Sequence, residues 1–343
     1  MDRKKRLADV ARMVGCSITT VSRVINNNSS VNDRTRQAVE KALQEIGYFE
    51  NKKMPEREGK KQLIGLIIPN MLAIGIYPFV KGVMEVADLH NFNVITSESN
   101  HSVVNETKLC KSMIECGAQG IVFFPCAPHS GECLLQIPKS YPIVVLDRST
   151  KNIPENTVSV LVDHKYNGYL GTKYLLNLGH KNIAVLMGTY NGERSPSQLE
   201  MLKGYRKAIE EAGLQFREEL TIYGTTNIDV TTRAIDEFLS RKIPFSAIFG
   251  FNDLLAFGAY NALTKRDIKI PEDVSVLGHD STIFSEVLGM TTIDNRGIEI
   301  ARFAAEALFS LIDKKKLLEI TTVSKSSLMI RNSCGRFHGD KVY

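Results

Sequence analysis

The 343-residue chain lacks a hydrophobic run long enough to cross a membrane. The longest apolar run in its early part, residues 63–69, is far shorter than the roughly 20 residues that a transmembrane helix needs. Residues 2–6 are all charged and no apolar stretch follows them, which argues against a signal peptide. We therefore expect a cytoplasmic protein with no membrane partner.

Motifs for metal binding, redox chemistry and catalysis are also missing. The six cysteines form no CxxC pair, and the histidines show no zinc-binding spacing, so we expect reduced thiols and no metal site. The sequence has no Walker-type GxxxxGK loop, no GxGxxG after a predicted strand, no GxSxG elbow and no HExxH. Without these motifs a nucleotide has no phosphate-binding loop, and we expect no cofactor and no catalytic residues.

Excess positive charge is confined to the beginning of the chain. Residues 1–61 contain 14 Lys and Arg against 8 Asp and Glu, whereas the remainder contains 29 against 30. A basic segment attached to a near-neutral body indicates a polyanionic partner for that segment alone, although a solvated charged face would give the same composition.

Three short amphipathic helices are predicted at the N-terminal end. The first carries an apolar stripe that ends at Gly15, while Ser17 and Asn32 can cap the second and third helices. A polar and charged stretch follows. We therefore expect a helix-turn-helix domain in residues 1–50, a hinge or linker in 51–61, and a two-lobed domain in 62–343.

From residue 62 onward, short apolar runs alternate with amphipathic segments. The predicted strands are 63–68, 93–96, 121–124, 143–146, 183–186, 247–251 and 274–277. The predicted helices are 79–89, 108–116, 166–178, 199–212, 234–239 and 254–263. Uninterrupted apolar strands separated by helices indicate parallel sheets covered on both faces. One sheet would need too many strands, so we predict two doubly wound α/β lobes, which bind ligands at the carboxyl ends of their strands.

The second predicted helix has the surface that a recognition helix requires. Its outer face carries Ile18, Thr19, Ser22 and Arg23, and the Arg23 guanidinium can contact a guanine edge with two hydrogen bonds. Short polar donors lie nearby and suit phosphate contacts. They are Ser17, Thr20, Ser22 and Asn26. A generic small helical bundle would show the same helix pattern, but the basic charge favours DNA.

The segment from Leu7 to Tyr48 closely resembles the headpiece of the LacI/GalR family of repressors. It shares the DVA motif, the G-x-S turn, TVSRVxN, and the later TRxxV and IGY motifs. The resemblance implies a homodimer that binds a pseudo-palindromic operator in double-stranded DNA. It implies base contacts from Ile18, Thr19 and Arg23. It implies backbone contacts from Leu7, Ser17, Thr20, Ser22, Asn26, Val31, Asn32 and Thr35.

The linker departs from the family pattern. The family folds this segment into a hinge helix on DNA and wedges a leucine into the minor groove. Here the hinge candidates are Asn51, Met54 and Arg57, with Arg57 at the leucine position and Pro55 disfavouring helix at Met54. Either Met54 replaces the apolar wedge, or Arg57 enters a narrow minor groove without intercalating.

The resemblance continues from Gln62 to about Arg331, where the chain is similar to the periplasmic-binding-protein-like core of the same family. The PEDVSV run before Gly278 is the most specific motif. Several polar residues end or follow apolar strands, so they point into the crevice between the lobes and suit a ligand rich in hydroxyl groups. They are Asp147, Arg148, Asn252, Asp280 and Asn295. Tyr77 and Phe79 are expected in the loop after the first strand, where the family often stacks aromatics on a sugar.

Some family residues are replaced. Met201 stands where an arginine is frequent, unless Arg194 takes over that role, while His279 and Ser281 flank Asp280 in place of an aromatic and an aspartate. The effector is therefore expected to differ from a routine hexose.

The leading hypothesis is a transcriptional repressor of this family whose operator affinity is controlled by a small polar effector, a sugar or sugar derivative. An effector-dependent regulator requires unequal binding to two states, and the direction of the change stays open. The alternatives are a solute-binding protein, an α/β enzyme such as a sugar-modifying hydrolase, and a regulator that senses a phosphorylated carrier protein. Residues Leu7–Tyr48 favour the regulator over the first of these.

Overall fold

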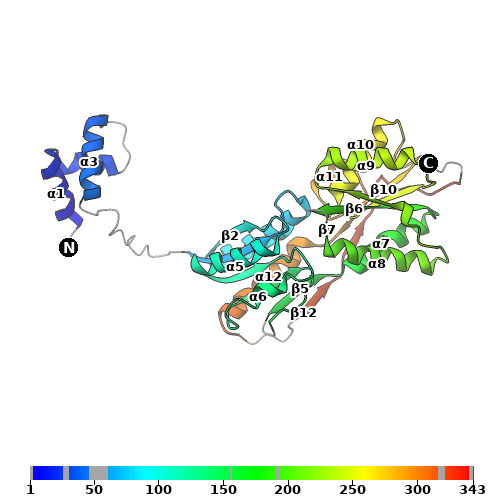
Figure 1. Ribbon diagram of the computed structural model, residues 1–343, viewed down its shortest axis with the longest axis horizontal. Helices are drawn as coiled ribbons and strands as arrows, with labels where there is room; N and C mark the ends of the chain where they lie inside the picture. Colours follow the sequence, from blue (N-terminus) through cyan, green and yellow to red (C-terminus); the bar gives the residue numbers. More distant parts are fainter. Residues whose placement is uncertain are drawn as a thin grey trace. The chain divides into compact units, whose positions relative to one another are not determined.

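The computed structural model describes residues 3–25, 31–45, 61–154, 157–190, 193–315, 321–339 and 343. The chain divides into two compact units, Met1–Lys60 and Lys61–Tyr343 (Figure 1). The predicted hinge residues Asn51, Met54 and Arg57 lie outside the described residues, as does Asn26. No helix in the described ranges is both long and apolar enough to span a membrane.

The first unit is built from helices α1 (Arg3–Val14), α2 (Ile18–Ile25) and α3 (Asp33–Glu45). Gly15 has φ +70°, a left-handed conformation that glycine adopts without strain and that allows the tight connection between α1 and α2. The three helices bury one small core. Its buried members are Val10, Ala11, Val21, Val24, Val39, Ala42 and Leu43.

Both predicted helix caps are present. The Ser17 hydroxyl accepts a hydrogen bond from the Thr20 amide at 3.1 Å. The Asn32 side chain accepts one from the Thr35 amide at 2.9 Å. Each bond satisfies an amide that has no partner within its helix.

Replacement of Asn32 by alanine is expected to destabilise α3 by about 1 kcal/mol, because the Thr35 amide loses its acceptor. Amide hydrogen exchange in α3 of the full-length protein should then accelerate about fivefold. The matched control is Gln37→Ala, at an exposed position within the same helix. Equal acceleration in both variants would contradict a capping role for Asn32.

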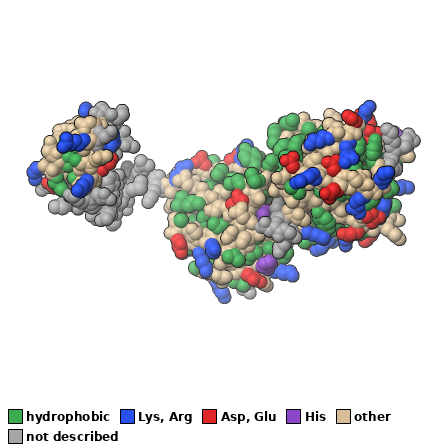
Figure 2. Space-filling model, turned by 45° about the horizontal axis from the view of Figure 1, so that its top comes forward, with side chains coloured by type: hydrophobic (Ala, Val, Ile, Leu, Met, Phe, Trp, Pro, Cys, Tyr) green, Lys and Arg blue, Asp and Glu red, His purple; other side chains and the backbone are tan. Residues whose placement is uncertain are grey.

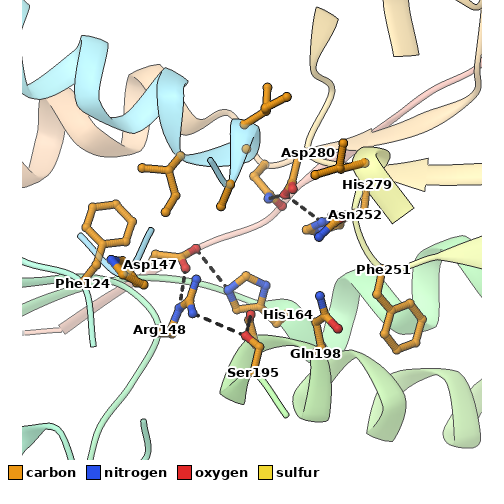
Figure 3. A pocket seen from close by; sticks show the side chains of 18 of the residues that line it. Phe124, Asp147, Arg148, His164, Ser195, Gln198, Phe251, Asn252, His279 and Asp280 are labelled. Carbon is orange, nitrogen blue, oxygen red and sulfur yellow. Dashed lines mark hydrogen bonds and ion pairs between the residues drawn. The ribbon is translucent and has the colours of Figure 1, made fainter. Parts of the chain in front are cut away.

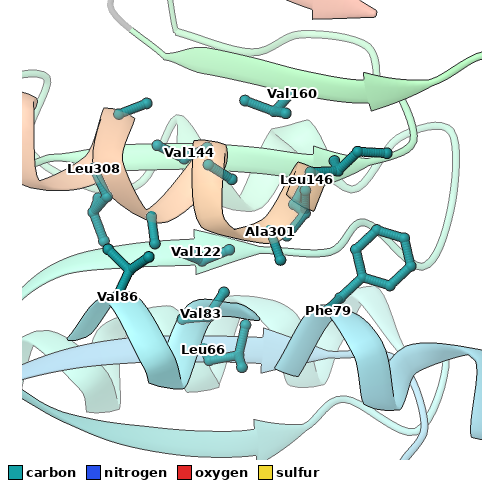
Figure 4. Close-up of a cluster of buried hydrophobic side chains, with 14 of the residues drawn as sticks. Leu66, Phe79, Val83, Val86, Val122, Val144, Leu146, Val160, Ala301 and Leu308 are labelled. Carbon is teal, nitrogen blue, oxygen red and sulfur yellow. The ribbon is translucent and has the colours of Figure 1, made fainter. Parts of the chain in front are cut away.

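The first lobe of the second unit is a six-stranded sheet in the order β12-β5-β4-β3-β1-β2, with every pair parallel. The strands are β1 (Gln62–Ile68), β2 (Phe92–Glu98), β3 (Ala118–Phe123), β4 (Ile143–Asp147), β5 (Val158–Val162) and β12 (Thr321–Ser324). The helices are α4 (Tyr77–Leu89), α5 (Val103–Glu115), α6 (Gly131–Leu134) and α12 (Gly297–Ile312), with a 3-10 turn, η1, at Ile74–Ile76. Helices α4 and α12 cover one face of the sheet, where Val83, Val122 and Leu308 join one buried cluster (Figure 4).

The second lobe has a seven-stranded sheet in the order β13-β11-β10-β9-β6-β7, with β8 also paired to β6. The strands are β6 (Ile183–Tyr190), β7 (Glu193–Arg194), β8 (Thr221–Gly224), β9 (Ala247–Gly250), β10 (Ser275–His279), β11 (Thr292–Asp294) and β13 (Ser327–Met329). The helices are α7 (His164–Asn177), α8 (Pro196–Glu211), α9 (Ile228–Ser240), α10 (Asp253–Lys265) and α11 (Ile283–Val287), with a 3-10 turn, η2, at Glu218–Leu220. Only the edge pairings of β7 and β13 are antiparallel among the described strands.

The described chain passes between the two lobes three times, from β5 to α7, from β11 to α12, and from β12 to β13. Each lobe is therefore completed by segments that are distant in sequence. The three short crossings lie next to the cleft and are the natural positions for a hinge.

The predicted fold class is confirmed: a helical headpiece is followed by two parallel-sheet α/β lobes (Figure 1). The predicted loop position of Tyr77 and Phe79 is wrong, because both belong to the first turn of α4. Pro78 lies in that first turn, where its fixed φ favours a helix start, and η1 precedes it directly.

Candidate functional site

Helix α2 presents the predicted base-reading residues on its exposed side. Ile18 is 49% exposed, and Thr19 and Arg23 are also exposed, whereas Val21 and Val24 are buried in the headpiece core. An exposed isoleucine next to an exposed arginine fits a surface that contacts both thymine methyl groups and guanine edges. Figure 2 shows Lys and Arg side chains on the visible face of this unit.

Four of the predicted backbone-contact residues lie at the N-terminal ends of α2 and α3. Ser17 and Thr20 hydroxyls are 2.9 Å apart at the start of α2, and Asn32 is exposed before α3. Val31 packs against the headpiece core. Thr35 lies in the first turn of α3, Leu7 within α1 and Ser22 within α2. The structure thus places Ser17, Thr20, Asn32 and Thr35 at helix N-termini, where amides and hydroxyls can bind phosphate.

A cleft between the two lobes forms the second candidate site (Figure 3). Both lobes and the crossing segments line it, with Pro69, Phe124 and Asp147 from the first lobe and Gln198 and Asn252 from the second. Its cavity volume is about 70 Å³, well below the roughly 300–1,000 Å³ of a ligand pocket. The lobes are therefore closed on each other, and a ligand larger than one or two waters requires the cleft to open.

Asp147 is the centre of one polar cluster in the cleft. Its carboxylate accepts a hydrogen bond from Arg148 Nε at 2.8 Å and lies 3.1 Å from His164 Nε2, while Arg148 Nη1 reaches the Ser195 hydroxyl at 3.4 Å (Figure 3). Burial alone would raise the pKa of Asp147, but His164 and Arg148 outweigh it and hold the pKa well below its ordinary value. The cluster connects β4 of one lobe to α7 and α8 of the other.

Asp280 is the centre of a second cluster. Its Oδ1 lies 2.8 Å from His279 Nδ1 and accepts a hydrogen bond from Asn295 at 3.0 Å. Asn295 in turn accepts hydrogen bonds from Asn167 at 2.8 Å and Ser326 at 3.0 Å. Burial lowers the pKa of His279, but the charge and hydrogen bond of the neighbouring Asp280 outweigh this effect. The net shift of the pKa is therefore upward. This cluster ties β10 to two of the crossings.

Backbone strain marks the same two carboxylates. Asp147 has φ +75° and Asp280 has φ +102°, and a non-glycine residue held in such a region costs about 1–3 kcal/mol. Each is at, or directly after, the carboxyl end of a parallel strand, one in each lobe. Two strained acidic residues facing one cleft indicate a binding site that tolerates this cost.

All of the predicted effector-binding residues line the cleft except Tyr77. Phe79 lines the cleft and packs edge-on against Phe124, with ring centroids 5.4 Å apart, whereas Tyr77 is 64% exposed and outside the lining. Asn252 lines the cleft and also caps α10 by accepting a bond from the Leu255 amide. Asp147, Arg148, Asp280 and Asn295 also line the cleft.

The replacement at Met201 has a structural consequence. Met201 is buried and lines the cleft, while Arg194 lies outside the cleft lining, with its guanidinium over the Tyr223 ring at 4.9 Å. Arg194 therefore does not supply the missing cation. The guanidinium in the cleft is that of Arg148, supplied from the opposite lobe.

Several polar lining residues were not predicted from the sequence, among them His101, His164, Ser195 and Gln198. His164 directly follows Asp163 at the end of a strand that the apolar pattern did not single out. Had that strand been recognised, the rule that used strand ends to find Asp147 would have indicated His164 as well. Burial, with Arg148 nearby, lowers the pKa of His101 to about 4.

Asp253 is a structural residue beside the cleft. It is fully buried and accepts hydrogen bonds from the Thr282 amide and hydroxyl and from the Thr292 hydroxyl. Burial raises its pKa to about 6 despite these bonds. The carboxylate therefore holds α10 against β10 and β11.

The raised pKa of Asp253 predicts a pH-dependent stability. The contribution of the protonated Asp253 side chain to the free energy of unfolding is fully present below the ordinary pKa of 3.8. It is lost as pH rises through about 6, because ionisation of the buried carboxyl group is unfavourable. Asp253→Asn should therefore gain stability relative to the parent between pH 4 and 7, by at most about 3 kcal/mol. Its amide can still donate to the Thr292 hydroxyl. Urea unfolding of the parent and of Asp253→Asn at pH 4 and at pH 7 measures this gain. A stability difference between the two proteins that is the same at both pH values would refute the prediction.

Residues 6–51 match the family described as bacterial regulatory proteins, lacI family. Residues 61–307 match the periplasmic binding proteins and sugar binding domain of the LacI family. The chain belongs to the LacI family.

Individual members of the LacI family agree with this assignment. The transcriptional regulator DegA of Bacillus subtilis (strain 168) is 33% identical over 298 residues, covering 84% of this chain and 86% of DegA. The regulator GalR of Escherichia coli (strain K12) is 28% identical over 334 residues, covering 95% of each chain. A solved complex of the transcriptional regulator CelR with cellobiose has a TM-score of 0.69 and 25% identity, covering 95% of this chain and 99% of that one.

Membership of the LacI family confirms the resemblance found in the sequence. The chain is a transcriptional regulator with a helix-turn-helix DNA-binding region and a core of the type that binds small effectors between its lobes.

Proposed function

We propose that the protein is a repressor whose operator affinity is set by a sugar or sugar derivative bound between the two lobes. One observation carries this proposal. At the closed cleft, the Asp147 cluster links the two lobes, and the Asp280 cluster links the second lobe to the segments that cross between the lobes. A ligand that inserts between them changes how the lobes close, and the closed and open states then have different affinities for it.

The chemistry of the cleft supports a ligand rich in hydroxyl groups. Carboxylates, amides and a guanidinium accept and donate several directional hydrogen bonds, while Phe79, Phe124 and Phe251 supply apolar surface for a ring. The CelR relative was solved with cellobiose. Met201 in the lining disfavours a ligand that depends on an arginine at that position, which separates this effector from a routine hexose.

A homodimer bound to a pseudo-palindromic operator is part of the proposal. Helix α11 exposes Ile283 and Val287, which are 58% and 76% exposed, and Phe284 stacks on Phe257 of α10 at 4.9 Å. Leu72 of the first lobe is 72% exposed. Apolar side chains exposed in both lobes favour burial against a second copy, and a twofold dimer presents two headpieces to half-sites about one helical turn apart.

The roles of individual residues follow the same proposal. Residues 1–50 bind DNA, 51–61 form the hinge, and 62–343 bind effector and partner. Ile18, Thr19 and Arg23 read bases from α2. The protein acts by binding, as do the DNA-binding regulators of its family. A regulator of bacterial genes of this kind works in the cytoplasm.

The test is selection of operator sequences by the purified full-length protein from a random duplex DNA library. We expect enrichment of one pseudo-palindrome. Selected DNA then serves to screen sugars and sugar derivatives for those that change its affinity. Asn252→Ala, in the cleft, should abolish the response to the active sugar while leaving DNA binding in its absence unchanged. Failure to enrich any sequence would refute operator recognition, and enrichment without a response to any sugar would refute the effector class.

A further inference from the structure

A second groove lies between the lobes, next to the effector cleft, and the two share the lining residues Arg148, His164 and Ser197. It is lined by residues 148–151 after β4, by the start of α7 and the first turns of α8, and by Val323 of β12. Its cavity volume is about 790 Å³, against about 70 Å³ for the cleft. This groove has the size of a small-molecule site in the closed arrangement of the lobes.

The groove is strongly cationic. Its lining contains Arg148, Lys151, Lys165, Arg194, Lys203 and Arg206, against the two acidic residues Asp163 and Glu200. Both acidic groups already have partners: Asp163 caps α7 by accepting a bond from the Tyr166 amide at 2.8 Å, and Glu200 lies 2.5 Å from Lys203 Nζ. Lys151 and Lys165 are exposed and form no ion pair with another described residue. Arg148, Lys203 and Arg206 are paired with Asp147, Glu200 and Glu218. The unneutralised positive charge of the groove is therefore that of Lys151 from the first lobe and of Lys165 and Arg194 from the second.

Two long helices begin at this groove. Helix α7 starts at His164 and α8 starts at Pro196, and both of these residues line the groove. The N-cap residue of α8, Ser195, makes no side-chain capping bond. The Asp163 carboxylate already caps α7, so the uncapped N-terminus of α8 is the one whose partial positive charge and free amides add to the charge of the lysines and favour an anion.

A buried polar atom at the groove has no partner. His164 is only 6% exposed and lines both the groove and the cleft. Its Nε2 contacts Asp147, whereas its Nδ1 forms no hydrogen bond with any described residue. Buried polar atoms are almost always paired, so an unpaired one beside a cationic groove indicates a ligand or water that completes it.

We propose that this groove is a second ligand site, for a small phosphorylated anion, distinct from the effector cleft. A phosphate group suits it because several cations and helix amides can share its oxygens. Lys151 comes from the first lobe and Lys165 and Lys203 from the second, so the bound anion draws the lobes together. Arg148, His164 and Ser197 line both sites and couple them. The coupling of the groove to the effector cleft rests on the proposed function, whereas binding of the anion in the groove does not.

Binding is tested with inorganic phosphate and glycerol phosphate, titrated calorimetrically into the full-length protein at constant ionic strength, with chloride as the reference anion. We expect saturable binding of both probes in the millimolar range or tighter. The double variant Lys151→Ala/Lys165→Ala should bind at least about tenfold more weakly, because it loses two charge-assisted contacts. The matched control is Lys139→Ala/Lys181→Ala, which removes two exposed lysines outside the groove.

Three results would overturn the proposal: no saturable binding by the parent protein, equal weakening in both double variants, or loss of binding in Asn252→Ala with the groove lysines intact. The last would place the anion in the effector cleft. Thermal melting in phosphate-free buffer checks that both double variants are folded. Because the titration contains no DNA, its failure is distinct from a failure of operator selection.

Discussion

Arg23→Ala is expected to weaken binding to the selected operator by about 5- to 150-fold, the loss that accompanies a missing bidentate contact to one base. Arg23 is exposed on α2, and the headpiece core is built from other residues of that helix. The variant should therefore fold normally and lose discrimination at one position of each half-site. Equilibrium titration of the operator and of an unrelated duplex at the same salt concentration measures both quantities.

Lys41→Ala is the control for Arg23→Ala. It removes one positive charge from an exposed position on α3, outside the predicted recognition surface. We expect it to change affinity for both duplexes by the same small factor. If Arg23→Ala also weakens both duplexes equally, Arg23 contacts phosphate and reads no base.

Gly204→Ala is expected to destabilise the second lobe by about 3 kcal/mol or more. A Cβ at Gly204 would lie 1.9 Å from the Lys165 carbonyl oxygen, and one at Gly168 would lie 1.9 Å from the Met201 carbonyl oxygen. Helices α7 and α8 thus pack backbone against backbone, and a methyl group forces them apart. This cost exceeds the roughly 1 kcal/mol that alanine gains over glycine within a helix.

Urea unfolding of the full-length protein measures this loss, with Gly213→Ala as the control. Gly213 follows α8 with φ +72° and has no neighbour within 4 Å, so alanine there introduces backbone strain without a clash. We expect the control to lose about 1–2 kcal/mol. Comparable losses in the two variants would mean that α7 and α8 can separate at little cost.

The sequence predicted the elements whose signals are local. The three headpiece helices follow from apolar spacing and from caps at Ser17 and Asn32, both present in the structure. Long apolar strands such as β1 were also predicted. Some short strands, such as β8 and β11, were missed because their three or four residues show no clear apolar pattern. Helix α12 was missed because it is apolar around much of its surface, as befits a helix that joins the main core of the first lobe.

Part of the cleft was predicted because some of its residues also have a local signal in the sequence. Asp147 and Asp280 follow recognisable strands, so their positions were visible in the sequence. His164 was missed because it follows β5, a strand that the apolar pattern did not single out, and Asn167 reaches the cleft residue Asn295 only because the chain crosses from β5 to α7. The groove beside α8 gathers lysines from segments that are about 50 residues apart in sequence, so no local pattern could reveal it.

The crossings between lobes also determine the order in which the protein can fold during its synthesis. The first lobe needs Ala301 and Leu308 of α12 to cover Val122 and Val144, yet α12 is translated after almost all of the second lobe. At roughly 5–20 residues per second, the ribosome takes on the order of 10–30 s to pass from β5 to the end of α12. During that interval α4 alone covers this face of the first sheet, and the part that α12 covers stays open. The first lobe is therefore begun before the second lobe but is not completed before it.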